Sequence, residues 1–301
     1  FISSDNEKSV IQSGHVLAMG NAASQINEIA STNDLTSGIR FINNTSNISK
    51  DILNGNNLDK YIGILKSIKS KVSDSPNYSF TTSSVDKDVL KIKNDFESAL
   101  NTLNNQDYSP RQEDSIGWIT GSQVCFCAEA FPSVDSRHED APALTVLGAV
   151  LRNGYLHSAI REKGGAYGSG ASQDSHNEVF KFFSYRDPKC SETFDEFNSA
   201  RRWSLKNISE AQLDEGILGV ISSIDKPLSP YGEAMNDFMR ELDHKTQEDR
   251  LLFRSRVRSC SVDNLVNVSE KYLFNKSKIS VIAGESFEDE IKNLGFKLKN
   301  I

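Results

Sequence analysis

The sequence predicts an α+β fold in which one mostly antiparallel sheet is covered by helices, largely on one side, after a helix-rich first part. Three observations lead to this prediction. Apolar residues recur every three or four positions over most of the chain, which is typical of amphipathic helices. Runs rich in β-branched and aromatic residues read as strands at 123–131, 166–173, 178–185 and 277–283. Stretches rich in Asn, Ser and Gly separate these segments.

Helical periodicity dominates the first hundred residues, and little strand pattern accompanies it. The expected helices cover 10–31, 58–72 and 85–103, and one short strand is expected at 78–83. The face of the first helix carries small residues such as Ala18 and Ala22, which permit close backbone approach. A sheet that lacks so many strands suggests a partial domain whose beginning lies outside the chain.

A polar stretch at 104–117 is the strongest linker signal, because it holds Asn-Asn-Gln-Asp and Ser-Pro and offers little to bury. We therefore expect one domain to end near it and another to begin. The predicted division is 1–104 and 105–301.

The second part alternates strands and helices around a glycine-rich centre. After the strand at 123–131, a helix is expected from Pro142 to Lys163, and Gly164-Gly165 ends it as a C-cap pair. Asp174–Asn177 reads as the turn of a hairpin. The later helices are expected at 191–207, 209–223, 230–242, 245–257, 261–274 and 287–294.

Composition excludes several classes of protein. The 301 residues carry a formal net charge of −7, whereas nucleic-acid-binding proteins usually present a basic patch to the phosphates. No run of about 18 apolar residues occurs, so no membrane-spanning helix is expected. The four cysteines are too few and scattered for a disulfide framework, so we expect reduced, mostly buried thiols. Cys125 and Cys127 share one strand face, but two thiols alone do not make a zinc site.

A search for a self-contained catalytic motif finds none. None of the five histidines is followed by a second histidine three to five residues later, so neither His-Glu-X-X-His nor His-X-X-Glu-His is present. Gly168-Ser169-Gly170 lacks the glycine two residues before the serine that a nucleophile elbow needs. We therefore expect no metal ligands in this chain.

The segment from 151 to 171 stands out, although its residues alone also have a structural interpretation. Arg161 and Lys163 would complement the dipole at a helix C-terminus. Gly164 and Gly165 would stop the helix, and Tyr167 would begin a strand.

Ile160-Arg161-Glu162-Lys163-Gly164-Gly165-Ala166-Tyr167-Gly168 resembles the signature of the C-terminal half of pitrilysin/insulinase-type metallopeptidases. Asn153-Gly154-Tyr155-Leu156-His157 is similar to the presequence-protease and falcilysin branch of that family, as are Ser13-Gly14-His15 and Ser37-Gly38-Ile39. Ser169 departs from the pattern, since a further glycine is common there.

The resemblance implies metallohydrolase-like α+β domains, of which this chain would hold the end of the third, at 1–104, and the zinc-less fourth, at 105–301. In the family that the motif resembles, two halves, each built of two such domains, would close over a peptide. The zinc would be bound by the N-terminal half, outside this chain. By motif position, Arg161 and Tyr167 would bind the substrate and stabilise the oxyanion. Gly164, Gly165 and Ala166 would let an extended peptide approach the backbone.

The resemblance thus implies a zinc metalloendopeptidase that degrades short unstructured peptides and that is inactive when reduced to this chain. The expected partners are a peptide substrate and the N-terminal half of the same enzyme. The alternative is a non-catalytic homologue that acts as a scaffold or substrate-binding subunit. No address is legible in the sequence, and an organellar location, mitochondrial or plastid-like, is implied by the resemblance alone.

Overall fold

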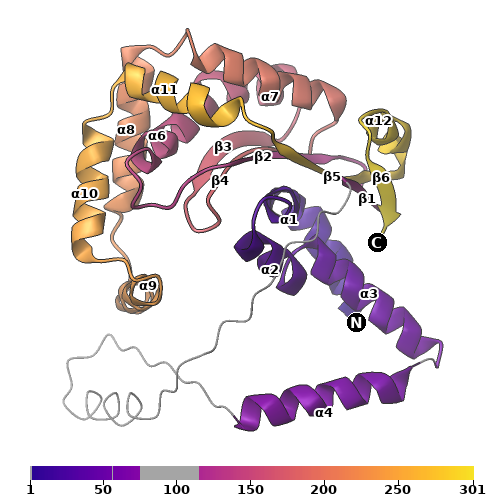
Figure 1. The fold of residues 1–301 in the computed structure, drawn as a ribbon. Coiled ribbons are helices and arrows are strands. Elements are labelled where there is room, and N and C mark those ends of the chain that lie inside the picture. The colour runs from indigo at the N-terminus through magenta and orange to yellow at the C-terminus, as the bar shows by residue number, and fades with distance from the viewer. Residues whose placement is uncertain (1, 56, 75–114) are drawn as a thin grey trace. The chain divides into compact units, whose positions relative to one another are not determined.

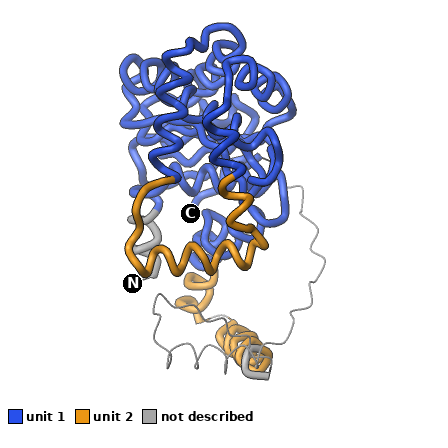
Figure 2. The backbone as a smooth tube through the Cα atoms, turned by 90° about the vertical axis from the view of Figure 1, so that its left-hand side faces the viewer, with its two compact units in different colours: residues 1–47, 109–224, 252–301 blue, residues 48–108, 225–251 orange. Residues whose placement is uncertain are grey.

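The computed structural model describes residues 2–55, 57–74 and 115–301. It divides into two compact units (Figure 2). The first unit combines 1–47, 109–224 and 252–301, and the second combines 48–108 and 225–251. The predicted strand at 78–83, the predicted helix at 85–103 and the predicted boundary at 104 lie outside the described residues. The division into 1–104 and 105–301 stays a prediction.

One six-stranded sheet organises the first unit, with the order β3-β4-β2-β5-β1-β6 (Figure 1). The strands are β1 Ile116–Thr120, β2 Phe126–Pro132, β3 Gly168–Asp174, β4 Val179–Tyr185, β5 Lys278–Gly284 and β6 Lys297–Asn300. The pairs β3·β4, β4·β2 and β2·β5 are antiparallel, whereas β1 pairs in parallel with both β5 and β6. The prediction of one mostly antiparallel sheet is confirmed.

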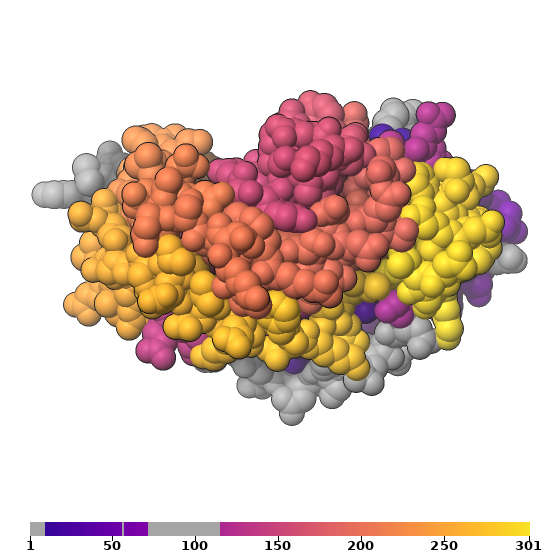
Figure 3. All heavy atoms as spheres, turned by 90° about the horizontal axis from the view of Figure 1, so that it is seen from above, coloured from indigo at the N-terminus to yellow at the C-terminus, as the bar shows by residue number. Residues whose placement is uncertain are grey.

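Helices cover both faces of this sheet. On one face lie α6 Ala141–Leu151, the π-helix η1 Arg152–Lys163, α7 Ser191–Ser204 and α11 Val262–Leu273, with α8 Glu210–Ile224 packed on α6. Figure 3 looks onto this helical layer from above. On the other face, α1 Ile2–Ser24 contacts β2, β4 and β5, and α2 Glu28–Thr36 packs on α1 (Figure 1).

Alternation along β2 explains the two layers, because successive side chains of a strand point to opposite faces. Cys127 and Phe131 belong to the buried cluster beneath α6 and α7. Phe126 and Ala128 belong to a second cluster with the apolar residues of α1. Every residue of β2 except the last is therefore buried.

The N-terminal helices are attached to the sheet by a buried polar centre at Asn21. Its amide nitrogen donates to Asp34 Oδ2 at 2.8 Å. Its oxygen accepts from Trp118 Nε1 at 3.2 Å and from Ser280 Oγ at 2.9 Å. One side chain of α1 thus bonds α2, β1 and β5, all within the first unit.

The structure differs from the sequence prediction in three respects. The helix expected over 10–31 is two helices, because Asn27 begins α2 as an N-cap that accepts from Ala30 N at 2.9 Å. The Asn-rich stretch after it contains α3 Ile39–Leu53, which was not predicted. The short strands β1 and β6 were also missed. Only their pairing with each other and with β5 defines them, since four or five residues carry little periodicity.

The remaining helices follow the prediction closely. They are α4 Leu58–Asp74, α9 Pro230–Leu242, α10 Gln247–Arg258, the short η2 Glu285–Phe287 and α12 Glu288–Asn293. Among the described residues, none of these helices or those above is both long and apolar enough to span a bilayer.

Candidate functional site

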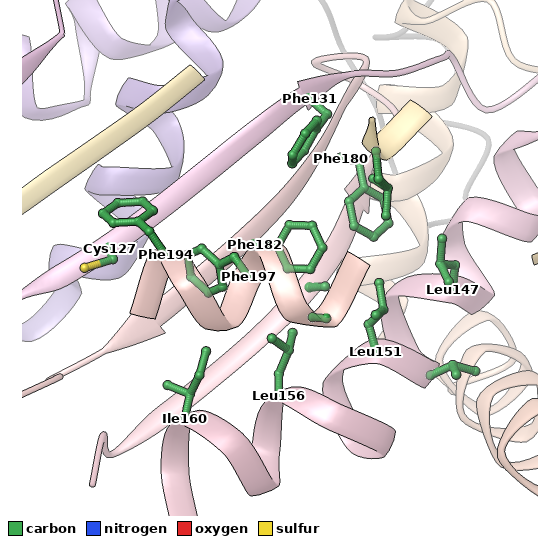
Figure 4. Packing of buried hydrophobic residues seen from close by; sticks show 14 of the residues in the cluster. Cys127, Phe131, Leu147, Leu151, Leu156, Ile160, Phe180, Phe182, Phe194 and Phe197 are labelled. Carbon is green, nitrogen blue, oxygen red and sulfur yellow. The ribbon is translucent and has the colours of Figure 1, made fainter. Parts of the chain in front are cut away.

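The segment that carries Arg161 is a twelve-residue π-helix, η1, which continues directly from α6. Its wider turn directs Leu156 and Ile160 into the core, where Figure 4 shows them facing Phe182 and Phe197. Arg161 is exposed on the other side. π-Helical turns are rare and are often found at functional sites.

Two glycines turn the chain sharply from η1 into β3. A Cβ on Gly164 would stand 2.4 Å from Ile160 O, so any side chain there would collide with the preceding turn. Gly165 has φ +87°, a conformation that favours glycine. Ala166 then donates from its N–H to Ile160 O at 3.1 Å, which closes the end of the helix.

An open hollow of about 670 Å³ lies at this turn, within the volume range of small-ligand sites. Its lining residues are His157, Arg161, Glu162, Gly165, Ala166, Tyr167 and Arg186. Tyr167 is 68% exposed, and Arg161 is exposed as well. The structure therefore brings the guanidinium and the phenol to one accessible surface.

His157 and Glu162 flank the guanidinium of Arg161. Arg161 Nη1 lies 3.1 Å from His157 Nε2, and His157 Nδ1 lies 3.5 Å from Glu162 Oε1. Because a guanidinium can only donate, Nε2 accepts and the histidine proton belongs on Nδ1, toward the carboxylate. The three side chains thus form a chain that orients Arg161.

Tyr167 rests on an aromatic support. Its ring meets Tyr185 edge-on, with centroids 5.6 Å apart and an interplanar angle of 84°. The ring of His15, on α1, lies 4.5 Å from the ring of Tyr185. Arg186 places its guanidinium 5.4 Å from the centre of the same ring, and its carbonyl accepts from Tyr167 N at 3.3 Å. Three separate segments therefore hold this side of the hollow.

Ser169, where the family pattern has a glycine, has a structural role. Its hydroxyl donates to Leu156 O at 3.0 Å, and this hydrogen bond joins the start of β3 to the π-helix. This hydrogen bond links η1, which carries Arg161, to the strand that begins directly after Tyr167.

Of the five residues expected at the site, the structure places four in the lining of the hollow and one outside it. Arg161, Gly165, Ala166 and Tyr167 line the hollow, and Gly164 is outside its lining. Ala166 is only 3% exposed and its N–H is already bonded. The functional roles of all five stay predictions.

Sequence reasoning did not assign His157, Glu162 or Arg186, which also line the hollow, or Tyr185, which supports Tyr167. His157 stands four residues before Arg161, a spacing that places two side chains on one helical face and could have pointed to their contact. Tyr185 and Arg186 come from the end of β4, and nothing in their sequence positions links them to η1.

The zinc implied by the family resemblance takes His and carboxylate ligands. Among the described residues, the group that brings three metal-binding side chains together is Cys125, Cys127 and Cys190. It contains neither a histidine nor a carboxylate. The described residues therefore do not fit that zinc.

The chain is similar to known proteins in sequence and in fold. A family model described as the PreP C-terminal domain matches residues 118–284, more than half of the chain. The chain belongs to this family. Its motif at 160–168 and the strands β2 to β5 lie inside the matched range, so the resemblance inferred from the motif is confirmed.

Curated relatives include two mitochondrial presequence proteases. The one from Saccharomyces cerevisiae is 27% identical over 320 residues, which cover 100% of this chain and 32% of the relative. The one from Drosophila melanogaster is 31% identical and covers 89% of this chain and 26% of the relative. The chain thus spans about a third or less of the length of these relatives.

Solved structures share the fold. A protease from Helicobacter pylori aligns with a TM-score of 0.56 and 18% identity over 66% of this chain and 53% of its own. A structure titled as the peptidase M16 inactive domain from Pseudomonas fluorescens aligns with a TM-score of 0.52 and 17% identity, over 65% and 50%. At these identities the similarity establishes the architecture, and it confirms the predicted fold class.

Proposed function

We propose that this chain is the zinc-less C-terminal part of a zinc metalloendopeptidase that degrades short unstructured peptides. The observation that carries the proposal is that Arg161 and Tyr167 line one open hollow. Membership of the PreP C-terminal domain family and the names of the curated relatives support it.

In this proposal Arg161 and Tyr167 act as paired hydrogen-bond donors. A guanidinium and a phenol can both donate to a peptide carbonyl, and the guanidinium is charged at any physiological pH. Donors held in place before the reaction stabilise negative charge that develops on the carbonyl oxygen. His157 and Glu162 would orient the guanidinium, and the edge contact with Tyr185 would hold the phenol ring.

The backbone at the turn would receive the rest of the peptide. Gly165 has no side chain and lines the hollow, so an extended chain can approach it closely. Arg186 adds a second guanidinium to the same surface, which favours carbonyl and carboxylate groups of a bound peptide. Gly164 would contribute by fixing the turn.

The zinc and the other half of the enzyme belong to the proposal as well. The metal would be held by residues outside this chain, in an N-terminal half that faces the hollow, and it would supply the Lewis acid for hydrolysis. The isolated chain would then be inactive. The relatives are named mitochondrial, which agrees with the organellar location that the family resemblance implies.

Two substitutions in the longer protein that contains this chain test the roles. Arg161→Ala and Tyr167→Phe should each reduce kcat for a short unstructured peptide about 10²–10³-fold, because each removes one oxyanion donor. Arg137→Ala and Tyr231→Phe are matched controls, since Arg137 and Tyr231 are both exposed and lie outside the lining of the hollow. The controls should retain full turnover.

Normal turnover in both Arg161→Ala and Tyr167→Phe would overturn the assigned roles. The scaffold alternative makes a different prediction: the longer protein would bind peptide without hydrolysing it, and the two substitutions would change peptide affinity alone. Measuring binding and turnover on the same samples separates the two functions.

A further inference from the structure

Three cysteine thiols meet in the core of the first unit, away from the hollow's lining. Cys127 Sγ lies 3.8 Å from Cys125 Sγ and 3.8 Å from Cys190 Sγ, and all three sulfurs lie within 4.8 Å of one another. Cys125 and Cys127 lie on the same side of the chain where it enters β2, and Cys190 comes from the segment before α7. All three side chains are completely buried. Figure 4 shows Cys127 on its strand in this core, and the contact with Cys190 was not visible in the sequence.

The groups around Cys190 favour the thiolate form of its side chain. Cys190 is the N-cap residue of α7, where the helix dipole stabilises a negative sulfur. Hydrogen bonds from the Cys125 and Cys127 thiols lower the pKa of Cys190 to about 5, whereas burial raises the pKa of the Cys127 thiol well above its usual value. The acidic groups nearby are Asp187, which is buried and whose pKa is raised by that burial, and the half-buried Glu290.

The spacing matches a metal–thiolate site of low coordination number. A metal about 2.3 Å from each of three sulfurs places those sulfurs about 4 Å apart. Structural zinc takes four ligands, whereas this group holds three, and no fourth His, Cys, Asp or Glu of the described residues joins it. Thiolates prefer soft cations, and Cu(I) is a soft cation that carries a single charge.

We propose that Cys125, Cys127 and Cys190 form a three-thiolate site for a single soft monovalent cation, Cu(I). Each thiol that binds gives up its proton, so binding releases up to three protons and changes no oxidation state. Because the thiols are buried, the cation enters while the chain folds.

Such a metal site would stabilise the backbone segment that carries Arg186, a residue that lines the hollow. Cys125 and Asp187 exchange two backbone hydrogen bonds, of 2.8 and 2.9 Å. Asp187 directly follows Arg186, whose carbonyl holds Tyr167 N. The metal would therefore fasten the start of β2 and the first turn of α7 around the segment that carries Arg186.

The test is refolding of the full chain without oxygen, in the presence of a reductant and of Cu(I) buffered by bicinchoninate. We expect one equivalent of copper per chain, a thiolate-to-copper absorption band in the ultraviolet, and affinity that rises with pH as protons are released. Cys190→Ser should weaken Cu(I) binding at least about tenfold, since even outer residues of metal sites have effects of that size. Serine is a favoured N-cap, so this variant should keep α7 and the fold, which circular dichroism checks.

Cys260→Ser is the matched control, because Cys260 is the one cysteine outside the cluster. Copper binding should be unchanged in it. Equal Cu(I) affinity in Cys190→Ser and in the unsubstituted chain would overturn the proposal. So would less than one equivalent bound by the unsubstituted chain, or a preference for Zn²⁺ over Cu(I) in the same competition. None of these readouts depends on peptide hydrolysis, so the metal site can fail while the proposed function stands, or the reverse.

Discussion

At the scale of single residues, backbone approach decides where α1 lies on the sheet. A Cβ on Gly14 would stand 2.5 Å from the ring of Phe126, a distance that real side chains do not tolerate. Gly20, on the same helix, has no atom within 4 Å of its Cβ position. Gly14 belongs to the Ser13-Gly14-His15 segment, which resembles the presequence-protease branch, and the structure gives a packing reason for a glycine there.

Gly14→Ala should therefore lower the free energy of unfolding by about 1–3 kcal/mol, because the added methyl overpacks the contact with Phe126. Gly20→Ala should leave it unchanged or raise it by up to about 1 kcal/mol, since alanine is the better helix former. Urea denaturation of both variants measures the difference. A Gly14→Ala variant as stable as the Gly20→Ala variant would show that α1 does not pack on β2 this closely.

At the scale of elements, the β3–β4 hairpin presents Tyr167 and Tyr185 at one end and is closed by a polar turn at the other. Asp174 bonds Asn177 N at 3.1 Å and Lys181 Nζ at 2.6 Å. Burial alone would raise the pKa of Asp174, but Lys181 and the bonds from Asn177 outweigh it and hold that pKa below its usual range. The charged form of Asp174 is thus the form that stabilises the folded hairpin.

The sign of the pH effect follows from this direction. Because the folded pKa of Asp174 is below the unfolded value of about 3.9, its contribution is complete at neutral pH and is lost as pH falls below that value. Asp174→Asn should lower the free energy of unfolding by about 1–3 kcal/mol at pH 7. The difference from the unsubstituted chain should shrink as the acid range is entered.

Asp289→Asn is the control for this titration, because the carboxylate of Asp289 is 99% exposed and its ion pair is weak. Denaturation curves from pH 7 to pH 3 should show no pH-dependent difference for it. A loss in Asp174→Asn that stays constant down to pH 3 would contradict the role of the charge.

At the scale of the whole molecule, the N-terminal helices form part of the same unit as the sheet. Asn21 is the buried polar group that bonds α1 to both α2 and the strands. Replacing it would leave Trp118 Nε1, Ser280 Oγ and Asp34 without this partner inside the core. A buried polar group that loses its partner is costly.

Asn21→Ala should accordingly lower the free energy of unfolding of the first unit by about 2–4 kcal/mol, from one or more unsatisfied groups. The fluorescence of Trp118, which is fully buried, should shift to longer wavelength if α1 loosens. A Trp203→Phe background isolates this signal. Asn293→Ala, at an exposed position of α12, should have no effect. Equal stability of the Asn21→Ala and Asn293→Ala variants would contradict the structural role assigned to Asn21.

Several features of the site could be predicted from residues that lie close together in the sequence. Pro142 and Gly164-Gly165 mark the ends of the α6–η1 segment, and Asp174–Asn177 marks the hairpin turn. The motif at 160–168 identified the family and pointed to Arg161 and Tyr167. These features depend on neighbours a few residues apart, which is the range over which propensity and spacing act.

Contacts between distant segments were decided by the tertiary structure alone. The strands β1 and β6 exist through their pairing, since neither has enough residues for a periodic pattern. Arg186 reaches the hollow because β4 pairs with β3, and Cys190 reaches Cys127 although the two are 63 residues apart in the sequence. The sequence by itself determined which side chains are chemically able to act. Which of them meet was settled by sheet order and helix packing, because burial and pairing depend on the whole chain.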